Sequence, residues 1–375
     1  MTRPGGKTVL LAAGGTGGHL FPAQALAHAL GERGWTVDLI TDERADKYGS
    51  AFPARTVHIV ASATVTGRSP VALARTGFAL ARGLVQSLGI VGRVRPAVVV
   101  GFGGYPTVPP LTAARLRGVP TILHEQNAVV GWANRLLAKH ATRIATGFER
   151  PKGTQEWTAK LALTGNPVRP AVLEAARTPY EAPVAGGAFR LLVFGGSQGA
   201  RAFADLVPPA IARLDPALRA RLKLTQQARP EDMERVRRAY ADLGVAAELA
   251  PFFTDMPARM AASHLIVCRS GASSVAELSV IGRPAVLVPL PHARDQDQAT
   301  NAAVLAGVGA AWPIAQTDLT ADPDRLAKEI TQLAGAPERL AAAAAAARAI
   351  AMPDAVERLA DLVEATARKD GDLTP

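Results

Sequence analysis

Short apolar runs alternate with amphipathic helical patterns along almost the whole chain. The apolar runs are only a few residues long and end in glycine-rich or polar turns, as buried strands do. Between them, apolar residues recur at helical spacing; the first such face is formed by Leu20, Ala23, Leu26, Ala27 and Leu30. Strands that alternate with helices in this way build parallel sheets covered by helices on both faces. The pattern therefore predicts an α/β protein.

The chain is long enough for two domains. Its 375 residues exceed the usual size of one hydrophobic core. An apolar run followed by Gly-Gly-hydroxyl-x-Gly occurs twice, at 9–18 and at 190–199. We therefore predict two Rossmann-like domains with parallel sheets, separated by a cleft. The prolines near 164–170 break regular structure and mark a boundary there. We expect a first domain of residues 1–166 plus about 352–370, and a second domain of residues 167–351.

Composition narrows the class of partner. The net charge of +10 favours an anionic ligand or surface, such as nucleic acid, a phosphorylated substrate or anionic lipid. Aromatic residues make up only 5% of the chain and do not interleave with a basic run, which argues against binding of single-stranded nucleic acid. The single cysteine excludes a disulfide framework. With neither a leader pattern nor an apolar run of roughly 18 residues, we expect a cytoplasmic address.

Three glycine clusters, at 14–18, 101–104 and 195–199, each follow an apolar run. Ligands of open α/β sheets bind outside the strand ends, and a helix start offers backbone N–H groups to an anion. The first cluster is not a dinucleotide fingerprint, because Leu20 stands where the third glycine is needed. No Gly-Lys-Ser/Thr follows it, which excludes a P-loop. Ordinary tight turns remain the alternative.

Three polar clusters also stand next to predicted strand ends. HEQNAVVGWANR at 124–135 and CRSGASSVAEL at 268–278 each lead from a strand into a helix, and PHARDQDQATN at 291–301 is the third cluster. Glu277, one or two turns into the second helix, is placed to reach a pair of sugar hydroxyls; a solvated helix glutamate is the alternative. His292, Asp295 and Asp297 match no standard carboxylate cage, so we predict no metal and no other cofactor.

Seven motifs in one order resemble a known family. They are GGTGGHLFPA, GFGGYP, HEQNAVVGWANRLLA, TGNPVR, GGSQGAR, CRSGASSVAE and DQDQATNA, and the resemblance spans about residues 7–365. The chain resembles the N-acetylglucosaminyltransferases that form lipid II in bacterial peptidoglycan synthesis. The resemblance implies the glycosyltransferase B fold, UDP-N-acetylglucosamine as donor, and the C4 hydroxyl of undecaprenyl-diphosphate-linked lipid I as acceptor. It also implies inversion at the anomeric carbon and no requirement for a metal.

The resemblance carries donor contacts onto this chain position by position. Glu277 would hold the ribose hydroxyls, and the backbone at Phe253 would face the uracil. Ser197 and Gln198, with nearby amides, would hold the diphosphate. The full set is Thr16, Gly17, Gly18, Asn127, Arg169, Ser197, Gln198, Phe253, Ala272, Ser273, Ser274, Val275, Ala276, Glu277 and Gln298.

The acceptor side is assigned in the same way. The first two glycine loops would cradle the acceptor diphosphate through Gly14, Gly15, Gly101, Gly103, Gly104 and Tyr105. Inversion needs a base for the acceptor proton and stabilisation of the charge on departing UDP. His19 is the first candidate base, because a helix start disfavours imidazolium and keeps the ring able to accept a proton. Glu125 is the second. A His19 that only hydrogen-bonds the acceptor or closes the loop is the alternative.

Three positions depart from the family pattern. Val130 stands in a proline position, and Ser274 replaces a threonine while keeping the hydroxyl. A Gln-Thr-Gly element is replaced by TQQARP, so Gln226 and Gln227 receive no role. None of these changes removes a group that the chemistry requires. A non-catalytic nucleotide-sugar-binding module of the same fold is the alternative function, and a Rossmann oxidoreductase is disfavoured by the failed fingerprint.

The stretch from Gly67 to Pro96 predicts a membrane contact. It carries five arginines (at positions 68, 75, 82, 93 and 95) and no acidic residue. Its apolar side is formed by Val71, Leu73, Phe78, Leu80, Leu84, Val85, Leu88, Ile90 and Val91. A basic helix with an apolar face can lie in a bilayer interface; a helix packed on the sheet is the alternative. We expect a peripheral protein on the cytoplasmic face of the inner membrane, with the anionic membrane surface and other cell-wall synthesis proteins as partners.

Overall fold

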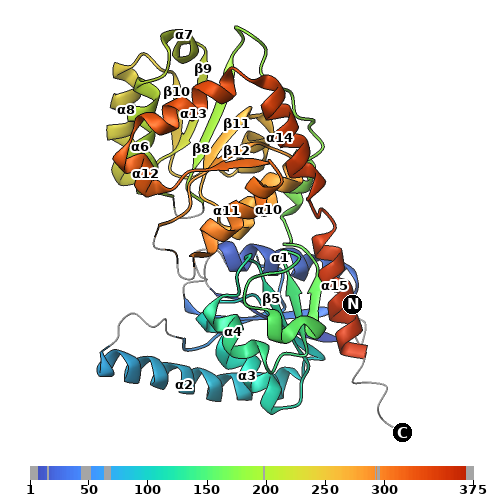
Figure 1. The fold of residues 1–375 in the computed structure, drawn as a ribbon. Helices are drawn as coiled ribbons and strands as arrows, with labels where there is room; N and C mark the ends of the chain where they lie inside the picture. The colour runs from blue at the N-terminus through green and yellow to red at the C-terminus, as the bar shows by residue number, and fades with distance from the viewer. Residues whose placement is uncertain are drawn as a thin grey trace. The chain divides into compact units, whose positions relative to one another are not determined.

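A computed structural model describes residues 7–14, 17–43, 52–62, 69–196, 199–291, 293 and 296–368, without the side chains of 70–73 (Figure 1). The chain forms two compact units. The first comprises Met1–Arg169 and Pro353–Pro375, and the second comprises Pro170–Met352. Each unit is built around one parallel sheet, so the predicted α/β class with two parallel sheets is confirmed.

The first unit contains a seven-stranded sheet in the order β3-β2-β1-β4-β5-β6-β7. Its strands are β1 (Thr8–Ala12), β2 (Thr36–Thr41), β3 (Thr56–Ile59), β4 (Val98–Gly101), β5 (Thr121–Glu125), β6 (Arg143–Thr146) and β7 (Leu161–Leu163). Strand β1 lies between β2 and β4, with Ala12 opposite Gly101. The ends of β1, β4 and β5 are therefore neighbours in space although they are far apart in sequence.

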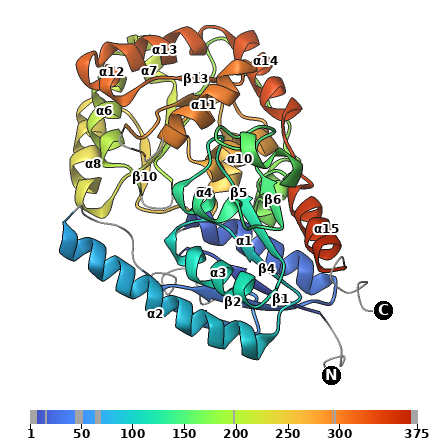
Figure 2. The same cartoon turned by 60° about the horizontal axis from the view of Figure 1, so that its bottom comes forward.

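Helices cover both faces of this sheet because its central strands are apolar on both sides. Val9 and Leu11 pack with α1 (Gly17–Glu32) and α15 (Ala355–Arg368). Leu10 and Ala12 point the other way and pack with α2 (Pro70–Val94), α3 (Val108–Leu116) and α4 (Trp132–Ala138). Figure 2 shows α2 and α3 together on their side of the sheet. The predicted apolar face of the first helix is buried at all five positions.

The last helix, α15, lies beside α1. The break before it contains Pro353, as expected of a residue that cannot continue a helix. Arg33 forms ion pairs with Glu357 and Asp361 across this contact, and the Trp35 indole donates to Glu364 at 3.3 Å. Such exposed ion pairs contribute little, so the buried apolar side of α15 dominates the contact.

The second unit contains a six-stranded parallel sheet in the order β10-β9-β8-β11-β12-β13. Its strands are β8 (Phe189–Phe194), β9 (Leu222–Gln227), β10 (Ala247–Ala250), β11 (Leu265–Cys268), β12 (Ala285–Leu287) and β13 (Ala311–Pro313). Its helices are α5 (Pro170–Ala175), α6 (Arg201–Ala212), α7 (Pro216–Ala220), α8 (Met233–Asp242), α9 (Met256–Ala262), α10 (Ala272–Ile281), α11 (Asp297–Gly307), α12 (Gln316–Ala321), α13 (Asp324–Ala334) and α14 (Pro337–Ala349). Short 3-10 helices lie in the first unit at η2 (Tyr105–Thr107) and η3 (Gln155–Lys160), and in the second unit at η4 (Pro230–Asp232).

A buried arginine fixes the position of α10 in the second unit. The Arg283 guanidinium donates to the carbonyl oxygens of Ala261, at the end of α9, and of Ile281, at the end of α10. It also reaches Thr178, beyond α5, at 3.1 Å. Positive charge at helix carboxyl ends is favourable, and burial lowers the pKa of this guanidinium to about 10. Arg283 therefore links the ends of α9 and α10 to the segment that follows α5.

Candidate functional site

The first group of candidate residues lies at the adjacent ends of β1, β4 and β5. The register pairs Ala12 with Gly101 and Gly101 with Leu123, so the three strands end almost level. Each then leads into a segment with few large side chains or with many polar ones. The segments that follow these three strands therefore begin at one edge of the sheet in the first unit, which is the edge where ligands of open α/β sheets bind.

The His19 imidazole lies against glycines from both loops. A methyl group added at Gly14 would lie 3.4 Å from Cδ2 of His19, and one added at Gly103 would lie 3.4 Å from Cε1. One added at Gly104 would lie 3.5 Å from Nε2. Gly103 and Gly104 also have φ values of +87° and +79°, which favour glycine. The structure thus brings the candidate base and the candidate acceptor loops together; Gly15 and Thr16 lie outside the described residues.

Other members of the acceptor set have different surroundings. Gly101 ends β4 and is buried, and a Cβ there would lie 2.8 Å from Leu111 Cδ1, so a side chain at this position would have to displace the Leu111 side chain. The Tyr105 ring stacks on Trp132, with 5.1 Å between ring centroids and an interplanar angle of 25°. Gly17 and Gly18 form the first turn of α1.

Glu125 is held in place from several sides. Its Oε1 accepts from the backbone N–H of Asn127 at 2.9 Å and from the Asn127 side chain at 3.4 Å. Its Oε2 accepts from the Gly131 N–H at 2.9 Å and from Asn134 Nδ2 at 2.8 Å. Burial raises the pKa of the carboxyl, while these four bonds oppose the rise. With 2% of its surface exposed and both oxygens engaged, Glu125 is suited to shaping the loop that carries Asn127.

The departure at Val130 adds a bond to the same loop. The backbone N–H of Val130 donates to the carbonyl of Lys152 at 2.9 Å. Proline has no N–H and could not make this bond. The replacement of the family's proline is therefore compensated by a backbone hydrogen bond.

The Thr-Gly-Asn-Pro-Val-Arg segment is attached to the end of β5. His124 Nε2 lies 3.0 Å from the carbonyl oxygen of Gly165, and Asn166 Nδ2 donates to the carbonyl of Gln126 at 2.8 Å. Burial lowers the pKa of His124 to about 4, so the ring is neutral near pH 7. Arg169, a predicted donor contact, places its guanidinium carbon 4.8 Å from the ring centroid of Phe21 on α1.

The second group of candidate residues lies at the strand ends of the second unit. Gly195, Gly196 and Gly199 connect β8 to α6; Gly196 and Gly199 have φ values of +88° and +66°. A Cβ on Gly195 would lie 2.2 Å from the backbone nitrogen of Ala200. The loop therefore requires glycine at all three positions. Ser197 and Gln198 lie outside the described residues.

The Ser-Gly turn after β11 leads into α10, which carries six predicted contacts. Ala272 and Val275 are buried in the core, Ser273, Ser274 and Ala276 are half-buried, and Glu277 is buried in the second turn. Ser270 Oγ donates to the carbonyl of Gln298 at 2.8 Å. The Gln298 side chain accepts from the Leu290 N–H at 3.1 Å. The turn after β11 and the start of α11, both predicted donor segments, are thus bonded to each other.

Phe253 follows β10 and is mostly buried. The guanidinium carbon of Arg259 lies 4.2 Å from its ring centroid. Arg259 is itself held by Glu248 and Asp255, at 2.6 and 2.7 Å. The Phe253 ring is therefore held by Arg259. The role predicted for Phe253, to face the uracil, concerns its backbone and not this ring.

Three polar residues of the second unit were not assigned a role from the sequence. Gln227 accepts from the Gly195 N–H, and Arg229 donates to the Gly199 carbonyl at 3.3 Å. Arg269 donates to the carbonyls of Val288 and Pro289 and to the Gln316 side chain. All three stand at or just after strand ends. A polar residue directly after an apolar strand is the signal that could have identified them.

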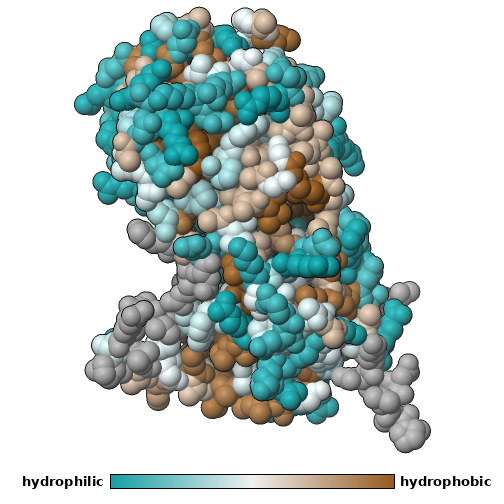
Figure 3. All heavy atoms as spheres, in the orientation of Figure 1, coloured by the Kyte–Doolittle hydropathy of each residue, from teal (hydrophilic) through white to brown (hydrophobic). Residues whose placement is uncertain are grey.

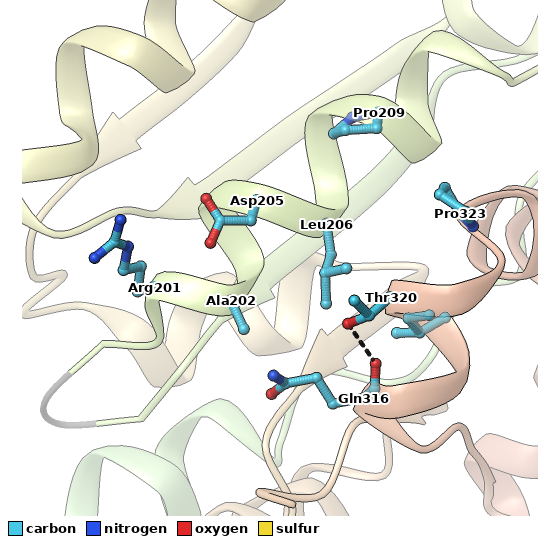
Figure 4. Close-up of a pocket in the computed structure, with 9 residues that line it drawn as sticks. Arg201, Ala202, Asp205, Leu206, Pro209, Gln316, Thr320 and Pro323 are labelled. Atoms are coloured by element: carbon cyan, nitrogen blue, oxygen red, sulfur yellow. Dashed lines mark hydrogen bonds between the residues drawn. The ribbon is translucent and has the colours of Figure 1, made fainter.

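A hollow of about 500 Å³ opens between α6 and α12 (Figure 4). Figure 4 shows the side chains of Leu206 and Thr320 facing each other across it, with Arg201 at one end. None of the predicted site residues that the structure describes lines it. It is therefore not formed by the described residues of the predicted donor site.

The residues that the structure describes also bear on a membrane span and on a metal site. No helix in that part of the chain is long and apolar enough to cross a bilayer. Among the same residues, no three His, Cys, Asp or Glu side chains gather where they could hold a metal ion. His292 and Asp295, weighed above as metal ligands, lie outside the described ranges.

Most of the predicted membrane stretch forms helix α2, and some of its side chains are buried in the core while others are exposed. Ile90 and Val91 are buried against the sheet, so part of the predicted apolar side belongs to the core. Phe78 and Val85 are 74% and 71% exposed, and Arg75 and Arg82 are exposed beside them. Figure 3 shows hydrophobic surface along this edge of the first unit, over α2 and α3. Arg68 and the side chains of Val71 and Leu73 are not described.

Two family models match the two units. The glycosyltransferase family 28 N-terminal domain matches residues 9–146, and the C-terminal domain matches residues 190–359. The UDP-N-acetylglucosamine–N-acetylmuramyl-(pentapeptide) pyrophosphoryl-undecaprenol N-acetylglucosamine transferase of Sinorhizobium fredii is 57% identical over 96% of this chain and 95% of its own. The enzyme of the same name from Methylobacterium nodulans is 59% identical over 96% of both chains. The chain belongs to this family of N-acetylglucosamine transferases.

Solved structures agree with this assignment. The crystal structure of Acinetobacter baumannii MurG is 30% identical, with a TM-score of 0.77 over 96% of this chain and 99% of that one. The calicheamicin glycosyltransferase CalG4 is 16% identical, with a TM-score of 0.66, and shows the fold alone. The predicted family and the glycosyltransferase B fold are both confirmed.

Proposed function

We propose that this enzyme transfers N-acetylglucosamine from UDP-N-acetylglucosamine to the C4 hydroxyl of the N-acetylmuramoyl-pentapeptide of lipid I, forming lipid II for peptidoglycan synthesis. The observation that carries the proposal is identity of 57% over nearly the full length to a transferase of that name. The arrangement of His19 between two glycine loops supports it, because it provides a basic nitrogen beside backbone suited to an anionic acceptor.

The second unit is proposed to hold the donor. Glu277 on α10 would accept hydrogen bonds from the ribose hydroxyls, and the loop of Gly195, Gly196 and Gly199 would offer N–H groups to the diphosphate. The bond between Ser270 and Gln298 supports this, since it holds two predicted donor segments in one arrangement. Arg169 would add positive charge where negative charge grows on the leaving UDP.

The first unit is proposed to hold the acceptor. His19 would take the proton of the C4 hydroxyl as that oxygen forms its bond to the anomeric carbon and the bond to UDP breaks. Gly14, Gly103 and Gly104 leave room beside the ring, which a larger residue would fill. Glu125 would act indirectly, by fixing the loop that presents Asn127. Its satisfied carboxylate supports this positioning role over the alternative role of base.

The lipid-linked acceptor lies at a membrane, and α2 is proposed to contact it. Phe78 and Val85 would enter the interface, and Arg75 and Arg82 would approach anionic headgroups. We propose a peripheral protein on the cytoplasmic face of the inner membrane. Binding to other cell-wall synthesis proteins remains a proposal drawn from the resemblance alone.

The direct test is transfer of labelled N-acetylglucosamine from its UDP derivative to a lipid I analogue, with and without EDTA. We expect a β-1,4-linked disaccharide product and activity that persists with EDTA. Donor binding without turnover would favour the alternative of a non-catalytic binding module. Complete inactivation by EDTA, reversed by a divalent cation, would contradict the expectation that no metal is needed.

A further inference from the structure

One glutamine side chain connects two strand ends of the second unit. Gln227, the last residue of β9, accepts through Oε1 from the backbone N–H of Gly195 at 3.0 Å. Through Nε2 it donates to the backbone carbonyl of Pro251 at 3.1 Å. Gly195 begins the glycine loop after β8, and Pro251 begins the turn after β10. The two bonds therefore span the full width of β9, the strand between them.

Both backbone groups that Gln227 contacts lie in segments whose backbone is proposed to bind the donor. Gly195 has no room for a side chain, because a Cβ would lie 2.2 Å from Ala200 N. Pro251 stands two residues before Phe253, whose ring is fixed by Arg259. Gln227 itself is 3% exposed, so water does not readily replace either of its partners. The amide thus holds one loop on each side at a set separation.

We infer that Gln227 is a positioning residue that fixes the distance between the diphosphate subsite and the uracil subsite of the donor. The inference rests on the proposed function, in which the loop at Gly195 receives the diphosphate and the backbone at Phe253 faces the base. A ligand with both groups gains from two loops that are already spaced correctly. A ligand with only one of the groups contacts one loop and gains nothing from the spacing.

The neighbouring glutamine provides a matched control. Gln226 is also buried, but its partners are the carbonyl of Phe203 on α6 and the hydroxyl of Tyr240 on α8. It therefore ties helices to the sheet and touches neither donor segment. Replacing Gln226 removes the same chemical group from the same strand without disturbing the spacing.

The experiment compares Gln227→Met, Gln227→Glu and Gln226→Met with the parent enzyme. Calorimetric titration measures the Kd of each for UDP, for uridine and for inorganic pyrophosphate, and thermal denaturation reports folding. Met removes both bonds, and Glu keeps the acceptor for Gly195 while losing the donor to Pro251. For both Gln227 variants we expect the Kd for UDP to rise about tenfold, the usual effect of losing a partner in a buried hydrogen bond. The values for uridine and pyrophosphate should change less than about twofold.

The outcomes separate the inference from the function on which it rests. Equal weakening of UDP, uridine and pyrophosphate in the Gln227 variants, or no weakening of UDP, would overturn the positioning role. Loss of UDP affinity in Gln226→Met to the same extent would overturn it too, because general destabilisation would then suffice. Failure of the parent enzyme to bind UDP would instead refute the proposed donor site.

Discussion

Asn134 Nδ2 donates to Glu125 Oε2 at 2.8 Å, joining α4 to the end of β5. Since the other oxygen of Glu125 accepts from Asn127, the carboxylate spans both ends of the loop between β5 and α4. A glutamine at 125 would turn an amide N–H₂ toward one of these donors. We expect Glu125→Gln to lower kcat/KM about tenfold or more, through the loss of charge-assisted hydrogen bonds.

The pH profile distinguishes positioning by Glu125 from catalysis by it. If Glu125 only positions the loop, the acidic limb of the kcat profile should keep its midpoint in Glu125→Gln. The exposed Glu149→Gln serves as the matched control and should behave like the parent enzyme. Disappearance of the acidic limb in Glu125→Gln would make Glu125 the base.

Replacement of His19 should affect turnover much more than donor affinity. Loss of a general base typically costs about 10²- to 10⁴-fold in rate. We expect His19→Ala to lower kcat in this range while the Kd for UDP stays within a few-fold. His28→Ala, an exposed histidine on the same helix, is the control. A His19→Ala enzyme with nearly parental kcat would show that another group takes the proton.

Replacement of Glu277 should weaken donor binding. A carboxylate that accepts from two hydroxyls contributes about 1.5–3 kcal/mol, so Glu277→Ala should raise the Kd for UDP roughly tenfold or more. Glu277→Gln provides a variant of similar volume at this buried position, and the exposed Glu338→Ala is the control. Parental UDP affinity in both folded Glu277 variants would remove this residue from the donor site.

Reversal of two charges on α2 should weaken membrane binding. Each arginine near anionic lipid contributes about 1 kcal/mol, and salt screens that attraction. We expect Arg75→Glu/Arg82→Glu to sediment less with anionic vesicles than the parent enzyme does, most clearly at low salt. Arg177→Glu/Arg237→Glu changes the net charge equally at exposed sites of the second unit. Equal sedimentation of both double variants would place the membrane contact elsewhere.

Two buried histidines should make the fold acid-sensitive. Burial lowers the pKa of His124 in the first unit and of His264 in the second to about 4, against about 6.5 when unfolded. Because the unfolded chain binds the extra protons, unfolding free energy should fall as pH drops from about 6.5 toward 4, by about 2 kcal/mol for each histidine between pH 7 and 5. Protonation of His264 would also break its Nδ1 bond to the Arg190 N–H.

Hydrogen exchange of each unit at pH 7 and pH 5 measures this effect. His124→Gln keeps a donor for Gly165, and His264→Asn keeps an acceptor for Arg190, but neither side chain can be protonated. We expect each variant to reduce the acid-induced loss of protection in its own unit. A parental pH dependence in both variants would assign acid sensitivity to other groups.

The local pattern of apolar, polar and glycine residues determined the fold class of this protein and the position of its glycine loops. Apolar runs separated by helical faces predicted two parallel sheets, because a strand buried on both sides is apolar throughout and a helix facing a core is apolar on one side. The glycines at 14, 103 and 104 could be identified as loop residues for a similar reason, since only close approach or positive φ selects glycine so often. The family motifs added the chemistry that such patterns alone do not carry.

Tertiary structure decided the rest, because strand order differs from chain order. Placing β1 beside β4 brings Gly103 to the His19 ring, and placing β9 between β8 and β10 lets Gln227 reach both Gly195 and Pro251. The position of Gln227 at a strand end could mark it as a candidate, but no local pattern shows which groups Gln227 or Arg283 contacts, since their partners are backbone groups that carry no sequence signal. The role of Glu125 likewise depends on how many donors surround its carboxylate. That number is set by the folded loop and not by the residue type.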